Sequence, residues 1–569
     1  MASESFGMSS LTGAVWDIRR RAPKELFARL EDVPALAVQL LHNRGYADEA
    51  AIREFLDGPL PPHDPYLLDG MDAAVARVTQ ALAQGERVYV YGDYDVDGVT
   101  GTALLLETFE MLGAAATPYI PERLAEGYGL NHDAIDAIGA QGPGLMVTVD
   151  CGIGSADEIA RARSHGIDTI VTDHHPGDGA DNGAAAVLNP NQPGGAYPFP
   201  GLSGVGVAYK LVQALAEEMP ERLPYPEEFL DLVALGTVAD MAPLRDENRT
   251  FVAEGLEALR QTRRRGLHAL GEIARRPVSR VGAADIAFGY APRLNAAGRL
   301  ARADLALQLL RAGHSVEAES LAHELDNLNI ERRRLTQLVI DAAAAQIDSA
   351  EPLVFAIGDE FPLGVVGLAA GRLVEQTGLP AFVGAHVNGM VRGSARAPDG
   401  VVLAEVLGTQ ANLLDAWGGH AQAAGFSVRP ERVDALRDGL VQELERAGVQ
   451  APAEPRLDAD CRVYPRTVTW ETYELTQQLG PFGEAHAEPR FVVENVAIDE
   501  TRVVGSTHLV LRFAELGADV EGIWFGQADL RHEIPPGRRC DVAFRLNLRT
   551  FNDETRLQML IDDIRHSAA

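Results

Sequence analysis

Cysteine and long apolar runs are scarce in this chain. Only Cys151, Cys461 and Cys540 occur in 569 residues, and they form no CxxC pair, which argues against a disulfide framework or a zinc knuckle. No stretch approaches the roughly 20 uncharged apolar residues that cross a bilayer, and the N-terminus lacks a basic region followed by an apolar one. We therefore expect a soluble, non-exported, cytoplasmic protein that has no membrane partner.

Positive charge is also in short supply. The net charge is −32 and the isoelectric point is about 4.8, which disfavours non-specific binding to duplex DNA over the whole surface. Lysine occurs only at Lys24 and Lys210, so nearly all of the 50 basic residues are arginine. The planar guanidinium suits bidentate phosphate contacts, although the coding bias of a GC-rich genome explains the same skew. We expect a local positive groove on an acidic body.

Three carboxylates are concentrated in one loop that follows an apolar strand. The segment RVYVYGDYDVDGVTG places Asp93, Asp95 and Asp97 at alternate positions. Carboxylates buried together repel one another unless a strong positive charge neutralises them, so this loop favours a divalent cation site. A solvated acidic turn with an Asx-type cap is the alternative interpretation.

Two further apolar strands end in residues that bind metals. LMVTV is followed by Asp150, and IDTIVT is followed by Asp173, His174 and His175, with a predicted helix over 157–165 between them. This is the pattern of a βαβ unit with parallel strands, whose carboxyl ends collect ligands at one edge of the sheet. A capping or core role for the histidine pair, and a helix-capping role for Asp150, are the alternatives.

A fourth carboxylate, Asp240, ends the apolar helical run FLDLVALGTVADM. Sites rich in oxygen, with one or two imidazoles, suit Mn²⁺ or Mg²⁺ better than structural Zn²⁺. About four to six anionic ligands favour two ions over one. Two ions about 3.5–4 Å apart activate water and clamp the oxygens of a phosphoryl group. Phosphoester hydrolysis is the predicted chemistry.

These motifs carry a family resemblance. GDYDVDG, VTVDCG, TDHH and VALGTVADM resemble, in order and spacing, the four motifs of the DHH phosphoesterase superfamily. Nearly the whole chain is similar to the RecJ family of single-strand-specific 5′ to 3′ DNA exonucleases, through LLHNRGYADEAAIREFL, IPERLAEGYGLN, APRLNAAGRL, VRGSARA, GGHAQAAGF and LGPFGEAHAEPRF. The resemblance implies two-metal hydrolysis of single-stranded DNA to 5′ mononucleotides in recombination and repair. It also implies cooperation with single-strand-binding protein and a RecQ-type helicase at the nucleoid, and we expect a monomer.

Composition shifts and the resemblance together predict an α/β protein with five parts. The breaker sequence GPLPPHDP, a long helical pattern without Gly or Pro, and a linker-like APAEP stretch at 451–455 mark the boundaries. The predicted parts are an N-terminal helical segment (1–58), a DHH catalytic domain with a parallel sheet (59–314), a long connecting helix (315–349), a DHH-associated substrate-binding α/β lobe (350–450) and an OB-fold β-barrel domain (451–569).

Some segments have more than one interpretation. Residues 176–201 are rich in Gly, Pro and Asn and predict a long surface loop, after which Gly201, Gly204 and Gly206 could cradle a phosphate or simply allow close helix packing. The cluster Arg332-Arg333-Arg334 in the long helix predicts a solvated face paired with nearby acids, with phosphate contact as the alternative.

The resemblance assigns the catalytic centre. Six residues would hold the metals: Asp93, Asp95, Asp97, Asp150, His174 and Asp240. Catalysis would involve Asp95, Asp97, Asp150, His174, His175 and Asp240. In this scheme His175 orients the phosphate or stabilises its developing charge. The sequence leaves open which carboxylates of the first loop bind a metal directly.

A second group of residues would hold the DNA end. Ser394 and Arg396 stand two apart on an extended segment, so they project to one face and could grip a 5′ phosphate, with an ion-paired tight turn as the alternative. The resemblance adds a stacking or blocking tyrosine, further arginines and a glycine-rich phosphate contact: Arg123, Tyr128, Arg293, Arg299, Gly419 and His420. A closed pocket with a passage too narrow for duplex would make a single-strand exonuclease.

Two departures and two alternatives remain. Pro362 stands where the family often has histidine, and EAHAEP replaces the usual GNPEP pattern, which puts finer substrate contacts in doubt. A DHH hydrolase of short oligonucleotides, cyclic dinucleotides or pyrophosphate is one alternative, but such chains are typically shorter and lack the added barrel. A non-catalytic replication scaffold is the other, and the presence of every candidate ligand argues against it.

Overall fold

The chain forms two compact units. The computed structural model describes residues 10–58, 60–123, 125–177, 179–348, 350–449, 455–517, 520–551 and 554–567. One unit is Pro62–Ala453, and the other joins Met1–Pro61 to Glu454–Ala569. All of the predicted linker at 451–455 except Pro455 lies outside the described residues. Among the described helices, none combines the length and apolar character needed to traverse a membrane.

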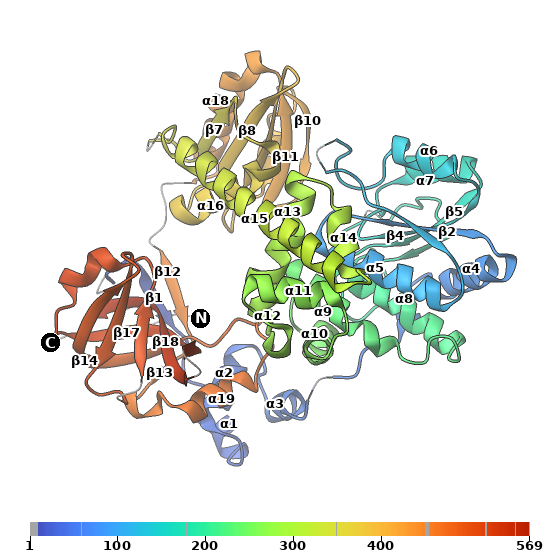
Figure 1. Ribbon diagram of the computed structural model, residues 1–569. Coiled ribbons are helices and arrows are strands. Elements are labelled where there is room, and N and C mark those ends of the chain that lie inside the picture. Colours follow the sequence, from blue (N-terminus) through green and yellow to red (C-terminus); the bar gives the residue numbers. More distant parts are fainter. Residues whose placement is uncertain are drawn as a thin grey trace. The chain divides into compact units, whose positions relative to one another are not determined.

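A five-stranded parallel sheet is the centre of the first half of the unit Pro62–Ala453 (Figure 1). Its strands, in spatial order, are β3 (Ala116–Tyr119), β2 (Arg87–Gly92), β4 (Gly144–Val149), β5 (Ile167–Thr172) and β6 (Ala186–Leu188). Every neighbouring pair is parallel. β6 lies within 176–201, where the sequence predicted only a loop, because a strand of three residues is too short to stand out.

Both faces of this sheet are covered. Alternate residues of a strand point to opposite faces, so Val88 and Val90 join one apolar core while Tyr89 and Tyr91 join another. The first core contains residues of α4 (Met71–Gln84), α5 (Val96–Met111) and α8 (Gly204–Glu218), and the second contains residues of α6 (His132–Gly139) and α7 (Ala156–Ser164). Because helices occupy both faces, the edge at the strand carboxyl ends is left for a site.

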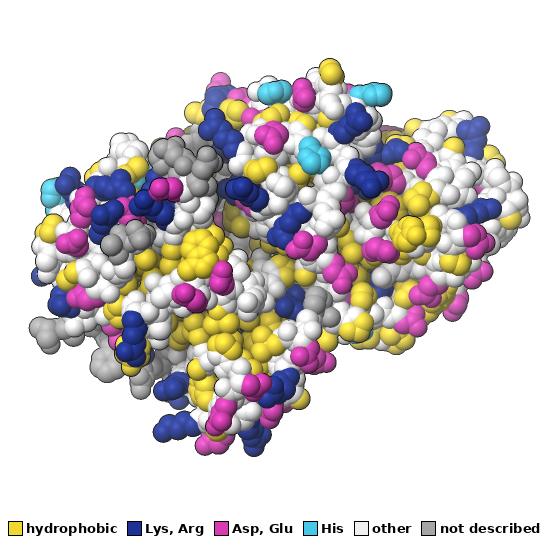
Figure 2. Space-filling view, turned by 60° about the horizontal axis from the view of Figure 1, so that its bottom comes forward, with side chains coloured by type: hydrophobic (Ala, Val, Ile, Leu, Met, Phe, Trp, Pro, Cys, Tyr) yellow, Lys and Arg dark blue, Asp and Glu magenta, His cyan; other side chains and the backbone are white. Residues whose placement is uncertain are grey.

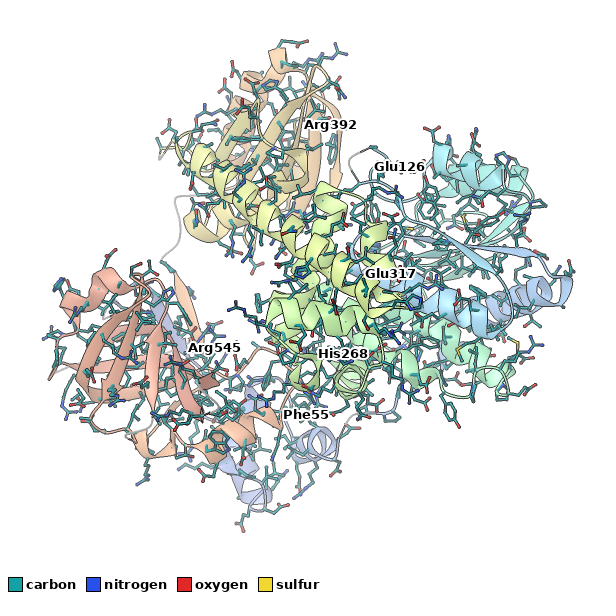
Figure 3. The ribbon with its side chains drawn as sticks, viewed as in Figure 1. Phe55, Glu126, His268, Glu317, Arg392 and Arg545 are labelled. Carbon is teal, nitrogen blue, oxygen red and sulfur yellow. The ribbon has the colours of Figure 1, made fainter. Side chains whose placement is uncertain are left out.

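A helical layer connects this sheet to a second lobe. It comprises α9 (Leu230–Ala239), α10 (Asp246–Arg260), α11 (Arg265–Ala274), α12 (Ala283–Asp285), α13 (Ala291–Leu300), α14 (Asp304–Leu310) and the 30-residue α15 (Ser315–Ala344). Glu317 marks the first turn of α15 in Figure 3. Leu325 of α15 packs in the core of the first sheet, and Val339 packs in the core of the second lobe. The long helix therefore joins two cores.

The second lobe is built on a mixed sheet. Its order is β10 (Leu414–Gly419), β11 (Ala423–Val428), β9 (Met390–Arg396), β8 (Ala381–Val387) and β7 (Val354–Gly358). Only β7 and β8 pair in parallel among these strands. Residues of α15 and α16 (Leu363–Thr377) share one core with this sheet, and residues of α17 (Leu403–Gly408) and α18 (Val433–Arg446) share another.

The other unit contains an OB-fold barrel. Strand order is β14 (Phe491–Val504), β15 (His508–Phe513), β16 (Glu521–Trp524), β18 (Glu554–His566) and β17 (Arg539–Phe551), and β17 pairs again with β14 to close the barrel. β13 (Cys461–Val463) adds in parallel to β14.

On the face of the molecule shown in Figure 2, basic and acidic side chains lie interspersed.

The N-terminal residues belong to this barrel unit. α1 (Lys24–Arg29), α2 (Ala35–Asn43) and α3 (Glu49–Leu56) share an apolar core with the barrel, and α19 (Trp470–Gln477) lies in the same unit. The segment also holds a strand that was not predicted: β1 (Val15–Ile18) pairs in parallel with β12 (Arg456–Ala459). Trp16 donates its Nε1–H to Asp563 at 2.7 Å. A strand whose partner lies near the other end of the chain has no local signal.

Candidate functional site

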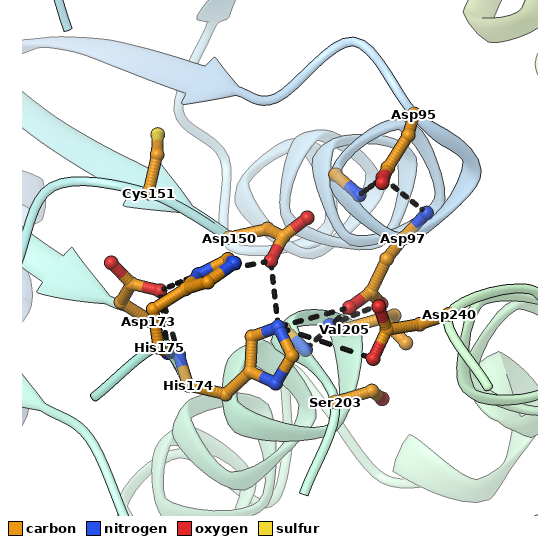
Figure 4. Close-up of polar contacts among 12 residues, drawn as sticks. Asp95, Asp97, Asp150, Cys151, Asp173, His174, His175, Ser203, Val205 and Asp240 are labelled. Carbon is orange, nitrogen blue, oxygen red and sulfur yellow. Dashed lines mark hydrogen bonds and ion pairs between the residues drawn. The ribbon is translucent and has the colours of Figure 1, made fainter. Parts of the chain in front are cut away.

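Three strand ends bring their polar residues to one edge of the parallel sheet. The amides of Asp93, Asp150 and Asp173 continue the backbone ladder by donating to carbonyls of the neighbouring strands, at 2.9–3.1 Å. Asp150 then turns sharply, with φ of 63°, in the left-handed region that non-glycine residues seldom adopt. Figure 4 shows Asp150 next to both histidines. Side chains that are remote in sequence thus meet at the strand carboxyl ends, as expected.

The first acidic loop divides its carboxylates between two tasks. Asp95 caps α5, because its Oδ1 accepts from the amides of Asp97 at 3.0 Å and Gly98 at 3.2 Å. The buried carboxylate of Asp97 accepts from the amides of Gly204 at 2.6 Å and Val205 at 2.8 Å, where α8 begins. The amides that could have cradled a phosphate therefore hold Asp97.

Close packing explains the glycine at this helix start. A Cβ at Gly204 would lie 2.6 Å from the Cβ of Asp150, a separation that real Cβ atoms essentially never show. Gly204 therefore lets α8 approach Asp97 and Asp150 at once.

His174 lies at the centre of the cluster. Its Nε2 is 3.0 Å from Oδ1 of Asp150 (Figure 4). The same nitrogen is 4.0 Å from Oδ2 of Asp97 and 4.0 Å from Oδ2 of Asp240. Burial and the neighbouring His175 lower the pKa of His174 to about 4. The ring is therefore neutral near pH 7, which is the form that binds a metal.

Asp173 fixes the second histidine. It is fully buried and accepts from the amides of Ile153, His174 and His175 and from Nδ1 of His175, the last at 2.8 Å. Burial alone would raise the pKa of Asp173, but the hydrogen bonds and charge of His175 lower it below its usual value. Burial works against a charged His175, yet Asp173 raises the pKa of that ring. Sequence reasoning named the TDHH motif but gave Asp173 no role.

The carboxylates need positive charge. Burial, followed by repulsion from neighbouring aspartates, raises the pKa of Asp97 to about 7 and of Asp240 to about 9, and raises those of Asp93 and Asp150 well above the usual range. Within the described residues, three buried atoms of this cluster lack a hydrogen-bond partner: Oδ1 of Asp93, Oδ1 of Asp150 and Nε2 of His174. Lone pairs that are buried without a donor suit cations.

The donor atoms group into overlapping sets that fit Mn²⁺ or Mg²⁺. Atoms within 4.8 Å of one another form the sets Asp93–Asp95–Asp150, Asp97–His174–Asp240 and Asp150–His174–His175. Oxygen donors predominate, with one or two imidazoles, which is the donor chemistry of these two metals. Because two of the sets share no residue, the cluster has room for two ions.

Positive side chains adjoin the acidic cluster. The guanidinium of Arg123 stacks on Tyr94, with 4.8 Å between Cζ and the ring centroid, and its charge offsets part of the rise that burial causes in the pKa of Asp93. Arg396 donates through Nη1 to Ser394 at 2.8 Å. Burial and the like charges of nearby arginines lower the pKa of Arg299 to about 9, while Asp95 opposes this. Arg123, Arg299, Ser394 and Arg396 therefore share one region.

The N-terminal turns of α16 approach this region closely. A Cβ at Gly364 would lie 2.1 Å from the carbonyl oxygen of Arg299. If Gly367 carried a Cβ, that atom would lie 3.0 Å from Oγ of Ser394 and 3.2 Å from Nη2 of Arg396. Gly364 therefore allows α16 of the second lobe to pack against Arg299, and Gly367 leaves room for Ser394 and Arg396 within the same lobe.

Of three further predicted substrate contacts, one lies at the acidic cluster and two have contacts elsewhere. Tyr128 lies at the metal cluster, where its hydroxyl donates to the carbonyl of Asp150 at 3.1 Å and is 2.9 Å from Nδ1 of His175. Arg293 is engaged elsewhere, by Asp326 at 2.9 Å. His420, at the exposed turn after Gly419, lines a 410 Å³ hollow with Val402 and Gln422 rather than the metal cluster.

Sequence reasoning assigned Asn295 no role at this site, and for Arg332 it predicted a solvated face, with phosphate contact as the alternative. Asn295 accepts from the amide of Val96 at 3.1 Å and so holds the start of α5. Arg332 of α15 is half-buried, and it is one of the charges that lower the pKa of Arg299. Helical spacing explains why Arg332 is not fully solvated, since it lies seven residues after Leu325 and three before Leu335.

Comparison with known proteins gives a consistent result. Family models match residues 87–237 (DHH family, N-terminal domain), 350–446 (DHHA1 domain) and 459–563 (RecJ OB domain). The chain is 36% identical over 563 residues to the single-stranded-DNA-specific exonuclease RecJ of Bacillus subtilis, covering 96% of this chain and 70% of that protein.

Solved structures agree with the sequence comparison. The crystal structure of RecJ from Thermus thermophilus in complex with Mn²⁺ has a TM-score of 0.83 at 32% identity, covering 97% of this chain and 80% of the other. The Mg²⁺ complex of RecJ from the same organism has a TM-score of 0.76 at 30% identity, with coverage of 97% and 79%.

Proposed function

This chain belongs to the RecJ family of single-stranded-DNA-specific exonucleases, and we propose that its clustered carboxylates and imidazoles hydrolyse single-stranded DNA from the 5′ end in recombination and repair. One observation carries the assignment of the site. Asp150 and His174 face each other at 3.0 Å, buried and without a hydrogen bond between them. A cation between such atoms satisfies both.

Asp93, Asp95, Asp97, Asp150, His174 and Asp240 would hold Mn²⁺ or Mg²⁺. When bound, these ions supply positive charge that activates water and neutralises the phosphoryl group. The protein keeps the donors fixed: the start of α8 holds Asp97, and Asp173 holds the backbone that carries His174. Held in this way, the donors need little reorganisation when substrate arrives.

His175 would act on the phosphate. Its Nδ1 pairs with Asp173, so a protonated ring keeps Nε2–H for a phosphate oxygen. The raised pKa of His175 favours this protonated form. We assign to His175 the stabilisation of charge that develops on the phosphate.

The arginines beside the cluster would set the 5′ to 3′ direction of degradation. Arg123, Arg299 and Arg396, with Ser394, would bind the 5′ phosphate, and Tyr128 would stack on or stop the first nucleotide. Water attacks the phosphorus of the first phosphodiester bond, the bond from phosphorus to O3′ breaks, and O3′ takes a proton. A 5′ mononucleotide leaves, and the shortened strand carries a new 5′ phosphate, which fits the same pocket.

The OB-fold barrel favours a polymer substrate over short oligonucleotides or cyclic dinucleotides, because barrels of this kind track single strands. We further propose that the enzyme acts as a monomer at the nucleoid, beside single-strand-binding protein and a RecQ-type helicase. Arg293, Gly419 and His420 would contact more distant parts of the strand, since none of them lies at the metal cluster.

The metal site is tested with Asp150→Ala. We expect the Mn²⁺-dependent degradation of single-stranded DNA to fall at least about 100-fold. The matched control is Asp136→Ala, which removes an exposed carboxylate paired with Arg161 on the same domain. Full activity in Asp150→Ala would refute the site, and no activity in the wild type would leave the scaffold alternative.

Polarity is tested with end-labelled single strands that carry a 5′ phosphate or a 5′ hydroxyl. We expect mononucleotides to be released from the 5′ end, with the phosphorylated strand preferred. A long strand compared with a dinucleotide separates an exonuclease from an oligonucleotide phosphodiesterase. Release from the 3′ end would contradict the proposed pocket.

A further inference from the structure

A group of arginines beside the candidate metal site lacks a direct ion pair among the described residues. Across the described ranges, Arg123, Arg299, Arg332 and Arg396 form no direct ion pair with an aspartate or glutamate, although the charge of Asp95 acts on Arg299 and the charge of Arg123 acts on Asp93. Arg123 stacks on Tyr94, Arg332 donates to Asn329, and Arg396 donates to Ser394 and to the carbonyl of Ala395. Elsewhere the same chain pairs its buried guanidinium groups, as in Arg264, which binds Asp231 and Glu107. Partly buried positive charges that form no direct ion pair favour an anion from outside.

Arg332 is unexpected because of its place on α15. Leu325, Leu328, Leu335 and Val339 form the apolar stripe of this helix, and helical spacing puts Arg332 in the middle of that stripe. Arg334 points the opposite way and pairs with Glu331 at 2.6 Å in solvent. A charge on the packed face of a helix costs stability, so a functional reason is needed.

Asn329 holds the guanidinium in place. Oδ1 of Asn329 accepts from both Nε and Nη2 of Arg332, at 3.2 and 2.9 Å. Asn329 is only 3% exposed, so its amide is fixed by packing. Because an amide oxygen carries no net charge, it orients the guanidinium without neutralising it. Nη1 remains for a ligand.

The surroundings bring Arg332 to the proposed 5′ pocket. Leu300, next to Arg299, packs in the same core as Leu335, one turn beyond Arg332. Burial lowers the pKa of Arg299 to about 9; the charges of Arg123, Arg332 and Arg396 contribute to this, and the charge of Asp95 opposes it. Burial also lowers the pKa of Arg332, with contributions from Arg333 and Arg372. Like charges held this close relax when a phosphate joins them.

We propose that Arg332, oriented by Asn329, is a fourth guanidinium of the 5′ phosphate pocket and a determinant of the preference for a phosphorylated end. This inference rests on the proposed function. A terminal phosphate carries up to two charges, so it gains more from a fourth arginine than an internal phosphodiester does. Arg332 acts on binding and leaves bond cleavage to the metal cluster.

The test compares strands ending in 5′ phosphate and 5′ hydroxyl. In Arg332→Ala we expect kcat/KM for the phosphorylated strand to fall at least about tenfold, with little change for the hydroxyl strand. Arg334→Ala is the matched control, because it removes the same charge two residues away on the solvated face. Binding of both strands in EDTA, followed by fluorescence anisotropy, repeats the comparison without hydrolysis.

Asn329 separates a structural role from anion binding. Asn329→Asp keeps the acceptor and would pair with Arg332, so a purely structural role predicts equal or greater thermal stability and normal activity. Our inference predicts normal stability with the 5′ phosphate preference reduced as far as in Arg332→Ala, because the new carboxylate neutralises the guanidinium. Asn329→Ala should reduce the 5′ phosphate preference less, since Arg332 keeps its charge and loses only the contact that orients its guanidinium.

The outcomes distinguish this inference from the function on which it rests. If the wild type prefers the phosphorylated strand and Arg332→Ala shows the same preference as Arg334→Ala, the inference alone is overturned. If Arg332→Ala loses kcat/KM equally on both strands, the inference is also overturned, because Arg332 would then contact an internal phosphate. A wild type that ignores the 5′ phosphate, or fails to degrade DNA with Mn²⁺, overturns the proposed pocket or function, and the inference with it.

Discussion

Asp97 and Asp240 show what burial does to single residues at this centre. Each carboxylate is largely removed from water and faces others of the same charge, so each holds a proton far more tightly than in solvent. A divalent cation reverses this preference, because it stabilises the ionised form. The centre is therefore built to gain stability from metal.

Metal removal should consequently make stability depend on pH. A carboxyl with a raised folded-state pKa contributes stability that is lost as pH rises, here from about 4, the unfolded value, through about 7 for Asp97 and about 9 for Asp240. We expect the free energy of unfolding in EDTA to fall between pH 5 and 9, and each tenfold difference in proton affinity between the folded and unfolded chain corresponds to about 1.4 kcal/mol. Urea unfolding across this pH range, with and without Mn²⁺, measures the loss, and identical profiles would contradict the prediction.

Gly204 allows a second test at the level of one residue. In Gly204→Ala the new Cβ collides with Asp150 and disturbs the amide contacts of Asp97, so Mn²⁺ affinity should fall by about 10–100-fold. Titration calorimetry measures the affinity, and circular dichroism checks the fold. Gly313→Ala is the control, because nothing lies within 4 Å of its Cβ position. Unchanged Mn²⁺ affinity would count against Asp97 and Asp150 as ligands.

At the level of elements, α8 carries a buried charge as well as the Asp97 contact. Lys210 is fully buried and pairs with Glu247 of α10 at 3.1 Å, and its Nζ also donates to the carbonyl of His63. The hydroxyl of Tyr197 donates to Glu247. Burial lowers the pKa of Lys210, although Glu247 opposes this. The pair thus connects α8 and α10 to the segment that enters the unit.

Lys210→Met should destabilise this unit strongly. Removing one partner leaves Glu247 as an uncompensated buried charge, which costs about 3–5 kcal/mol. Urea unfolding measures the loss. Lys24→Met, at the exposed second lysine, should change stability by less than about 0.5 kcal/mol. Adding Glu247→Leu to Lys210→Met should restore much of the loss, and a double variant as unstable as the single one would contradict this explanation.

At the scale of the whole molecule, the two ends of the chain build one unit. Val38 and Leu41 of α2 pack in the same core as Phe491 and Val542 of the barrel. β1 needs β12, and Arg44 binds Asp460 at 3.0 Å. The N-terminal residues therefore depend on a partner that is synthesised last.

Fragments test this dependence. We expect residues 62–453 to fold alone, to elute as a monomer and to degrade short single strands. Residues 1–453 should aggregate, because the apolar faces of α2 and α3 lose the barrel that buries them. Size-exclusion chromatography compares the two. A soluble, monomeric longer fragment would show that the N-terminal segment folds independently.

Much of the candidate metal site could be predicted from the sequence, since its residues follow strand ends. Apolar strands followed by Asp93, Asp150 and His174 can converge only at one edge of a parallel sheet, and the structure brings them there. A long helix over 315–349 was likewise predicted, because local spacing encodes it, and α15 spans Ser315–Ala344. What remained undetermined were contacts between elements.

Only the tertiary structure decided which face of α15 meets the second lobe, that Asn329 orients Arg332, and that α8 holds Asp97. The same holds for β1, whose partner strand β12 lies in the C-terminal quarter of the chain. The sequence by itself determined the residue types and the local periods, because these depend on neighbours a few positions away. Partners across elements depend on packing, and packing is a property of the whole chain.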